Sequence, residues 1–292
     1  MSAQAQFVPR VRPAARVAWP FLVLFAIMGV LYAPVLRLLV LHWWEDPDFS
    51  HGFLIPLFAA WVTWEERQRW QAAERRPSNL GLVAILAAMA MLVAGTLGAE
   101  LFLARTSLLV LFAGLLLFVE GPARTWVVAF PLASLALMIP LPAIIYNQIT
   151  FPLQLMASKL AATALDWTPI PVLREGNVLV LPNAVLEIVE ACSGVRSLLA
   201  LFALAVIYGH IRRAGRVARL VFLAVVPPIA VLSNAFRVFL TGVLTYRFGS
   251  LDPDGFLHLA LGWLVFISAL ALLLACDWGM SAASRRLEAR HG

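Results

Sequence analysis

The residues best suited to catalyse a reaction lie in the segment E-I-V-E-A-C-S-G-V-R-S at 187–197, which leads into a long apolar run. We expect its cysteine, Cys192, to lie in the first turn of a helix. Free backbone N–H groups and the positive end of the helix dipole favour a thiolate there. Arg196, four residues later, would add a cation on the same helical face. Cys192 is therefore a candidate nucleophile.

Two residues of complementary chemistry follow in later apolar segments. Arg237 lies beyond Arg219 by a stretch of helix about 27 Å long at ~1.5 Å per residue, close to the thickness of a bilayer core. His258 opens the last apolar segment. If successive helices alternate in direction, Cys192, Arg237 and His258 reach the same membrane face. A thiolate can attack an amide carbonyl, a guanidinium can stabilise the oxyanion, and an imidazole can protonate the leaving amine.

Other polar residues could support this trio. Asn234 lies on the same helical face as Arg237, three residues earlier, and His51 belongs to an S-H-G turn that could line the same pocket. Arg196 could tune the thiolate or pair with Glu190. These residue types also have a non-catalytic interpretation, because a cysteine at a helix start is often inert and an arginine at a helix end often extends to lipid head groups.

The composition limits what kind of protein can position these residues. Of 292 residues, 62% are hydrophobic and only 13% are charged, which indicates a polytopic membrane protein and excludes a soluble thiol protease. The net charge of +6 is then expected to mark topology, and we expect no nucleic-acid partner. The two cysteines, Cys192 and Cys276, cannot form a disulfide framework. No spacing favours a metal site, and no cofactor is expected.

The apolar pattern predicts an all-α polytopic membrane protein with about eight transmembrane helices. They are expected at 17–41, 52–64, 80–98, 101–119, 124–145, 192–210, 219 to beyond 237, and 256–276. An amphipathic stretch at 146–167 predicts a short interfacial helix, and residues 178–189 predict a small β-hairpin on the outer side.

The distribution of arginines predicts how these helices are oriented in the membrane. We expect cytoplasmic tails at 1–16 and 277–292 on either side of an integral membrane domain at 17–276, so that 15 of the 22 basic residues lie inside. The basic start before an apolar run is like a signal peptide. However, the run is long and lacks a small-residue cleavage site, which predicts a retained first helix.

Five motifs in order resemble the exosortase and archaeosortase family of membrane transpeptidases. They are D-F-S-H-G-F-L-I-P at 48–56, P-V-L-R-E-G-N-V-L at 171–179, E-A-C-S-G-V-R-S at 190–197, S-N-A-F-R-V at 233–238 and H-L-A-L-G-W at 258–263. The resemblance implies that Cys192 is the nucleophile, Arg237 the assisting arginine and His258 the third member. A histidine in that third position is typical of the bacterial exosortase branch.

The resemblance also implies substrates and a location. Family substrates are secreted proteins with a C-terminal signal: a short motif such as Pro-Glu-Pro (PEP-CTERM), a transmembrane helix and a basic tail. The expected enzyme is a cysteine peptidase or transpeptidase of the bacterial inner membrane. Its active site would face the periplasm, with membrane lipid around it, and it would serve protein sorting linked to exopolysaccharide export.

A different class of function fits the intramembrane arginine and histidine as well. A multi-spanning transporter uses such residues along its substrate pathway, and a haem-carrying membrane subunit uses histidines as ligands. A transporter should show repeated halves or paired broken helices, and the sequence shows neither. Haem ligation by two histidines requires them at matched depths, whereas His210 and His258 are expected at opposite faces.

Overall fold

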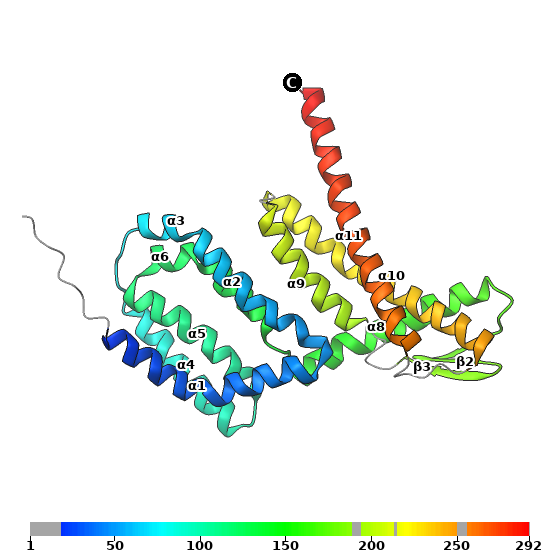
Figure 1. The fold of residues 1–292 in the computed structure, drawn as a ribbon, viewed down its shortest axis with the longest axis horizontal. Coiled ribbons are helices and arrows are strands. Elements are labelled where there is room, and N and C mark those ends of the chain that lie inside the picture. The colour runs from blue at the N-terminus through cyan, green and yellow to red at the C-terminus, as the bar shows by residue number, and fades with distance from the viewer. Residues whose placement is uncertain (1–18, 189–193, 213–214, 250–255, 292) are drawn as a thin grey trace, which may run out of the picture.

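The structure, a computed structural model, describes residues 19–188, 194–212, 215–249 and 256–291. Within them the chain is mostly helical, with one small three-stranded sheet (Figure 1). Long helices suit this apolar chain because a backbone that crosses lipid must satisfy all its N–H and C=O groups internally. The prediction of a helical membrane protein is confirmed.

In the first half of the chain, every element that the structure describes is a helix. They are α1 (Trp19–Glu45), η1 (Pro47–Phe53), α2 (Leu54–Glu65), α3 (Arg67–Ala72), α4 (Leu80–Leu97), α5 (Leu101–Val119), α6 (Pro122–Val127), α7 (Ala129–Ser134) and η2 (Leu135–Met138). The second half holds the sheet and the longest helices. These elements are α8 (Ala143–Asp166), β1 (Leu173–Glu175), β2 (Val178–Leu181), β3 (Ala184–Glu187), α9 (Val195–Ile211), α10 (Arg216–Phe248) and α11 (Phe256–His291).

Five helices of the described chain are long and apolar enough to cross a membrane, or up to six if one bent pair is a single span. The five spans are Ala26–Glu45, Leu80–Leu97, Leu101–Val119, Val217–Phe248 and Ala260–Gly279. The expected count of eight is not confirmed. One reason is length: α2 has 12 residues and α9 has 17, whereas a spanning helix needs about 20.

The other reason is a break near two prolines. The fifth predicted helix, at 124–145, is instead α6, α7 and η2, followed by a 75° bend into α8. Ile139 is extended, with ψ 118°, as expected for a residue before proline, and α8 begins directly after Pro142. A helix, α8, is present where the interfacial helix was predicted, but it starts earlier, at Ala143.

The predicted hairpin is present and has one further strand. β2 pairs with β3 as expected, and β1 adds an antiparallel third strand on the other side of β2. The turn between β1 and β2 is Gly176-Asn177, and Gly176 has the positive φ (65°) that a tight hairpin turn requires. This sheet packs on α8 and α10 through an apolar cluster that includes Leu165, Leu179 and Val238.

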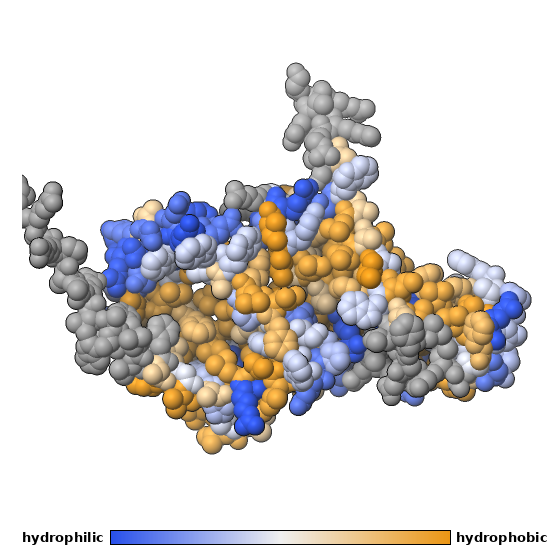
Figure 2. Space-filling view, viewed as in Figure 1, coloured by the Kyte–Doolittle hydropathy of each residue, from blue (hydrophilic) through white to orange (hydrophobic). Residues whose placement is uncertain are grey.

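Helices α9, α10 and α11 form a second packed unit. Leu201 on α9, Val226 on α10 and Ala269 on α11 are fully or almost fully buried in one cluster. Large apolar side chains on the outward faces remain exposed, among them Leu232, Trp263 and Ile267. Figure 2 shows hydrophobic residues over much of the helical surface, as expected for a protein that faces lipid.

Candidate functional site

Helix α10 brings Asn234 to the start of α9. Asn234 is only 3% exposed, and it contacts Gly194, the residue before α9. A Cβ added at Gly194 would lie 2.8 Å from the Cβ of Asn234. Cys192 lies outside the described residues, as does Glu190. Asn234 therefore packs against the backbone two residues beyond the candidate nucleophile.

Arg237, one turn further along α10, approaches a different helix. A Cβ added at Gly262 on α11 would lie 3.7 Å from Nη2 of Arg237, so the guanidinium lies beside that glycine. His258 is in the first turn of α11, four residues before Gly262, and residues four apart share a helical face. Its side chain lies outside the described residues. The guanidinium of Arg237 thus lies beside the second turn of α11.

Gly194 is the point where the chain turns into α9. It adopts the left-handed conformation, with φ 84°, directly before the first helical residue, Val195. This conformation is costly for any residue with a Cβ. Since the added Cβ would also meet Asn234, only glycine fits here.

We expect Gly194→Ala to destabilise the protein by more than the roughly 1–2 kcal/mol of left-handed backbone strain, because Asn234 must also move. Gly176→Ala is a matched control. It has a similar φ of 65°, but an added Cβ there would meet nothing within 4 Å. Thermal unfolding in detergent should therefore show a larger loss for Gly194→Ala. Equal losses would contradict the close contact with Asn234.

Arg196 has a partner that the sequence did not suggest. Its Nε donates a hydrogen bond to Oδ1 of Asp48 at 2.6 Å, and the hydroxyl of Tyr146 donates to the other carboxylate oxygen at 2.5 Å. Asp48 is buried, whereas the Arg196 side chain is 45% exposed. This ionic cluster ties η1, α8 and the first turn of α9 together. Arg196 was predicted to tune the thiolate or to pair with Glu190; the described contact is with Asp48.

The carboxylate of Asp48 is held in place by its own turn. Asp46 caps η1 by accepting a hydrogen bond from the backbone N–H of Asp48 at 2.9 Å. Phe49 packs against the ring of Tyr146, with centroids 5.9 Å apart. The indole of Trp43 lies close against Gly52 of η1, because glycine has no side chain there. A Cβ added at Gly52 would be 2.4 Å from Nε1 of Trp43. The motif at 48–56 therefore forms a packed support beneath the start of α9.

We expect Asp48→Asn to lower the free energy of unfolding by roughly 1–3 kcal/mol, because it leaves the guanidinium of Arg196 with a neutral partner. The effect should depend on Arg196. In a double-mutant cycle that combines Asp48→Asn with Arg196→Met, the coupling energy between the two substitutions should be about 1 kcal/mol or more. The exposed carboxylate of Glu187 on β3 provides the control, and Glu187→Gln should be close to wild type. A coupling energy near zero would contradict the structural role of the ion pair.

His51 lies in the same 3-10 helix but forms a different contact. Its Nε2 is 3.2 Å from the carbonyl oxygen of Leu137 on η2. Burial lowers the pKa of His51, although hydrogen bonds with the backbone of Leu137 and Asp48 partly oppose this effect. A neutral imidazole that donates to Leu137 acts as a structural link between η1 and η2. The structure thus places His51 against η2.

The remaining candidates have ordinary surroundings. Cys276 on α11 is a free, partly buried thiol at the edge of the apolar cluster of α9–α11. The ring of His210 stacks on Phe130, with centroids 4.9 Å apart, and its Nε2 is 3.7 Å from Oε2 of Glu65. Among the described residues, no group of three or more His, Cys, Asp or Glu side chains could hold a metal ion.

Comparison with known proteins gives the family. The sequence model described as "Transmembrane exosortase (Exosortase_EpsH)" matches residues 43–275, well over half of the chain. No curated protein and no solved structure matches. The matched range extends from the segment before η1 to α11 and includes every element of the candidate site. The chain belongs to the transmembrane exosortase family, and this membership implies an exosortase-type transpeptidase that acts on PEP-CTERM proteins.

Proposed function

We propose that this protein is a membrane-embedded cysteine transpeptidase or protease that cleaves the C-terminal sorting signal of secreted proteins through a thioester on Cys192. One observation carries the proposal most directly. A single helix, α10, brings Asn234 against Gly194 at the entry of α9, two residues beyond Cys192, and Arg237 beside Gly262 on α11, four residues after His258. In our proposal, these three segments, distant in sequence, supply a thiol, a guanidinium and an imidazole to one region.

The chemistry starts with attack of the Cys192 thiolate on the backbone carbonyl carbon of the signal motif. A C–S bond forms, and the carbonyl electrons become an oxyanion that Arg237 stabilises. Collapse of this intermediate breaks the C–N bond, and His258 donates the proton that the leaving amine requires. An amine or water then attacks the thioester, passes its proton to His258 and releases the thiolate.

The two arginines of the region have different roles in this mechanism. The guanidinium of Arg196 is bound to the carboxylate of Asp48, so its charge is largely balanced within the support beneath α9. Arg237 lies instead against Gly262, on the side of α10 that faces α11. We assign stabilisation of the oxyanion to Arg237, the arginine of the motif at 233–238, and we assign to Arg196 the ordering of the turn from which α9 begins.

The orientation that we propose places the site in the periplasm and both termini in the cytoplasm of a bacterial inner membrane. Figure 1 supports it: α3, α6, the end of α9, the start of α10 and the far end of α11 lie on one side, and the sheet and the starts of α9 and α11 lie on the other. The first side carries the arginine clusters. An excess of arginine marks the cytoplasmic side of a membrane protein.

The substrate's transmembrane helix would lie in the bilayer against the exposed apolar faces of α10 and α11. Leu232, Trp263 and Ile267 are 57%, 62% and 58% exposed, which suits contact with a helix or with lipid. A helix held there would bring the signal motif that precedes it to the membrane surface beside Arg237. The export of such proteins alongside exopolysaccharide is the cellular process that we propose.

Co-expression with a model substrate tests this function. The substrate carries a Pro-Glu-Pro motif, a transmembrane helix and a basic tail behind a soluble reporter. We expect the reporter to lose its C-terminal helix only when the enzyme is present, which a decrease in the mass of the reporter would reveal. A reporter that keeps its helix in the presence of the full-length enzyme would contradict the proposal.

A further inference from the structure

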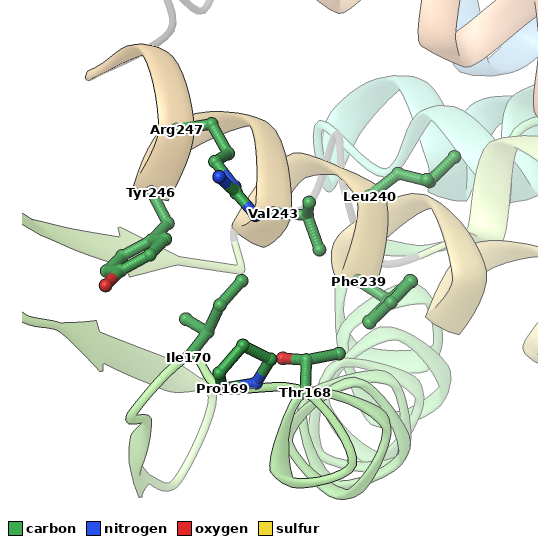
Figure 3. Close-up of a pocket in the computed structure, with 8 residues that line it drawn as sticks. All are labelled: Thr168, Pro169, Ile170, Phe239, Leu240, Val243, Tyr246 and Arg247. Atoms are coloured by element: carbon green, nitrogen blue, oxygen red, sulfur yellow. The ribbon is translucent and has the colours of Figure 1, made fainter.

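A pocket of about 480 Å³ opens beside the candidate site, between the segment that follows α8 and the last turns of α10 (Figure 3). This volume is within the range of about 300–1,000 Å³ that is usual for ligand sites. Its walls come from two short stretches of chain. They are Thr168, Pro169 and Ile170 on one side and Phe239, Leu240, Val243, Tyr246 and Arg247 on the other.

The walls combine apolar surface with one cation. Pro169 and Ile170 on one wall and Phe239 and Val243 on the other are apolar, and the guanidinium of Arg247 extends from α10 toward the space between the two walls (Figure 3). Arg247 is exposed and forms no salt bridge with any carboxylate of the described chain. The pocket therefore suits a ligand that has apolar rings and one negative charge.

Hydrogen bonds hold both walls in position. The hydroxyl of Thr168 donates to the carbonyl of Leu165 at the end of α8, at 2.6 Å. On the other wall, the side-chain amide of Asn183 donates to the carbonyl oxygens of Thr245 and Tyr246 at 3.2 and 3.1 Å, which fixes the sheet to the end of α10. A preformed pocket loses less entropy when it binds a flexible peptide.

The pocket lies within reach of the site. Arg237 and Arg247 are on the same helix, and their separation of ten residues corresponds to about 15 Å along its axis. An extended peptide spans about 3.3–3.6 Å per residue, so four or five residues cover that distance. A motif held under Arg247 would therefore present a nearby peptide bond to Arg237.

We infer that this pocket is the subsite for the sorting motif, with proline rings between the apolar walls and the motif's glutamate paired with Arg247. The inference rests on the proposed function, because the motif belongs to the substrate class of the family. Charge complementarity selects this occupant: a Pro-Glu-Pro segment offers two apolar rings and one carboxylate to a pocket with apolar walls and one cation. Arg247 is then a specificity-determining residue that binds substrate without taking part in bond cleavage.

A reciprocal charge exchange tests the subsite. With Arg247→Glu we expect processing of the Pro-Glu-Pro reporter at limiting substrate to fall about tenfold, the change that corresponds to ~1.4 kcal/mol of lost binding energy. The wild type should process a reporter with Pro-Lys-Pro poorly, and Arg247→Glu should restore the processing of this reporter. Lys159→Glu is the control, since it reverses an exposed charge on α8 outside the pocket. It should leave the preference for glutamate unchanged.

Three results would separate the subsite from the reaction itself. Unchanged processing by Arg247→Glu would overturn the subsite, because the pocket would then not bind the motif. Equal losses for the glutamate and lysine reporters would also overturn it, and would favour a lipid head group as the occupant. If the wild type fails to process the Pro-Glu-Pro reporter at all, the proposed function itself is wrong.

Discussion

Replacing Cys192 with alanine should abolish processing of a co-expressed substrate, and the full-length substrate should accumulate in the membrane. Without the sulfur no thioester can form, and the proposed mechanism has no other nucleophile. Cys192→Ser should be inactive as well, because a serine hydroxyl is far less acidic than a thiol and forms almost no alkoxide at neutral pH. The ratio of full-length to shortened reporter measures both variants.

The chain provides a matched control for this experiment. Cys276 is its other cysteine, a partly buried thiol near the far end of the membrane span of α11. Cys276→Ala should process substrate at the wild-type rate, which separates the loss of one particular thiol from the loss of any thiol. Normal processing by both Cys192 variants would show that the reaction uses another nucleophile.

The second large effect is expected from Arg237→Ala, which should slow processing by about 10²–10³-fold. Removal of a single donor from an oxyanion site typically has an effect of this size. Arg237→Lys should recover part of the rate, since lysine keeps the charge but lacks the planar fork of donors. His258→Ala should be nearly as damaging as Arg237→Ala. The initial rate of reporter shortening, measured at equal enzyme levels in the membrane, gives the comparison.

Arg219 is the control for Arg237 because it lies at the other end of the same helix. Its guanidinium lies 5.9 Å from the ring centre of Phe130, in the part of the molecule remote from Gly262. Arg219→Ala should change the processing rate far less than Arg237→Ala. Equal losses would indicate that arginines stabilise α10 as a whole and would remove the case for a specific role of Arg237.

Features set by local sequence were predictable. The bounds of α4 and α5 agree with the prediction to within one residue, because each is an uninterrupted apolar run with a clear stop. Glu100, between them, caps α5 by accepting a hydrogen bond from the backbone of Phe102. The three residues of β1 were missed, although the Gly176-Asn177 turn that follows them is a recognisable hairpin signal.

Features that depend on distant partners were not predictable in the same way. Asp48 and Arg196 lie 148 residues apart, and neither carries a local sign of the other. Glu190 is the expected partner of Arg196 because it is near in sequence. The bend after η2 shows the same limit: two prolines predict a break, but its 75° angle depends on the packing of α8 against α10 and the sheet.

The most direct test is to trap the acyl-enzyme. The enzyme is mixed in detergent with a synthetic peptide that carries the signal motif and part of the following helix, then quenched in acid and digested. Mass spectrometry should find the peptide containing Cys192 heavier by the N-terminal fragment of the substrate, and neutral hydroxylamine should remove the added mass. A substrate that is cleaved while Cys192 stays unmodified, or an adduct on another residue, would contradict the thioester mechanism.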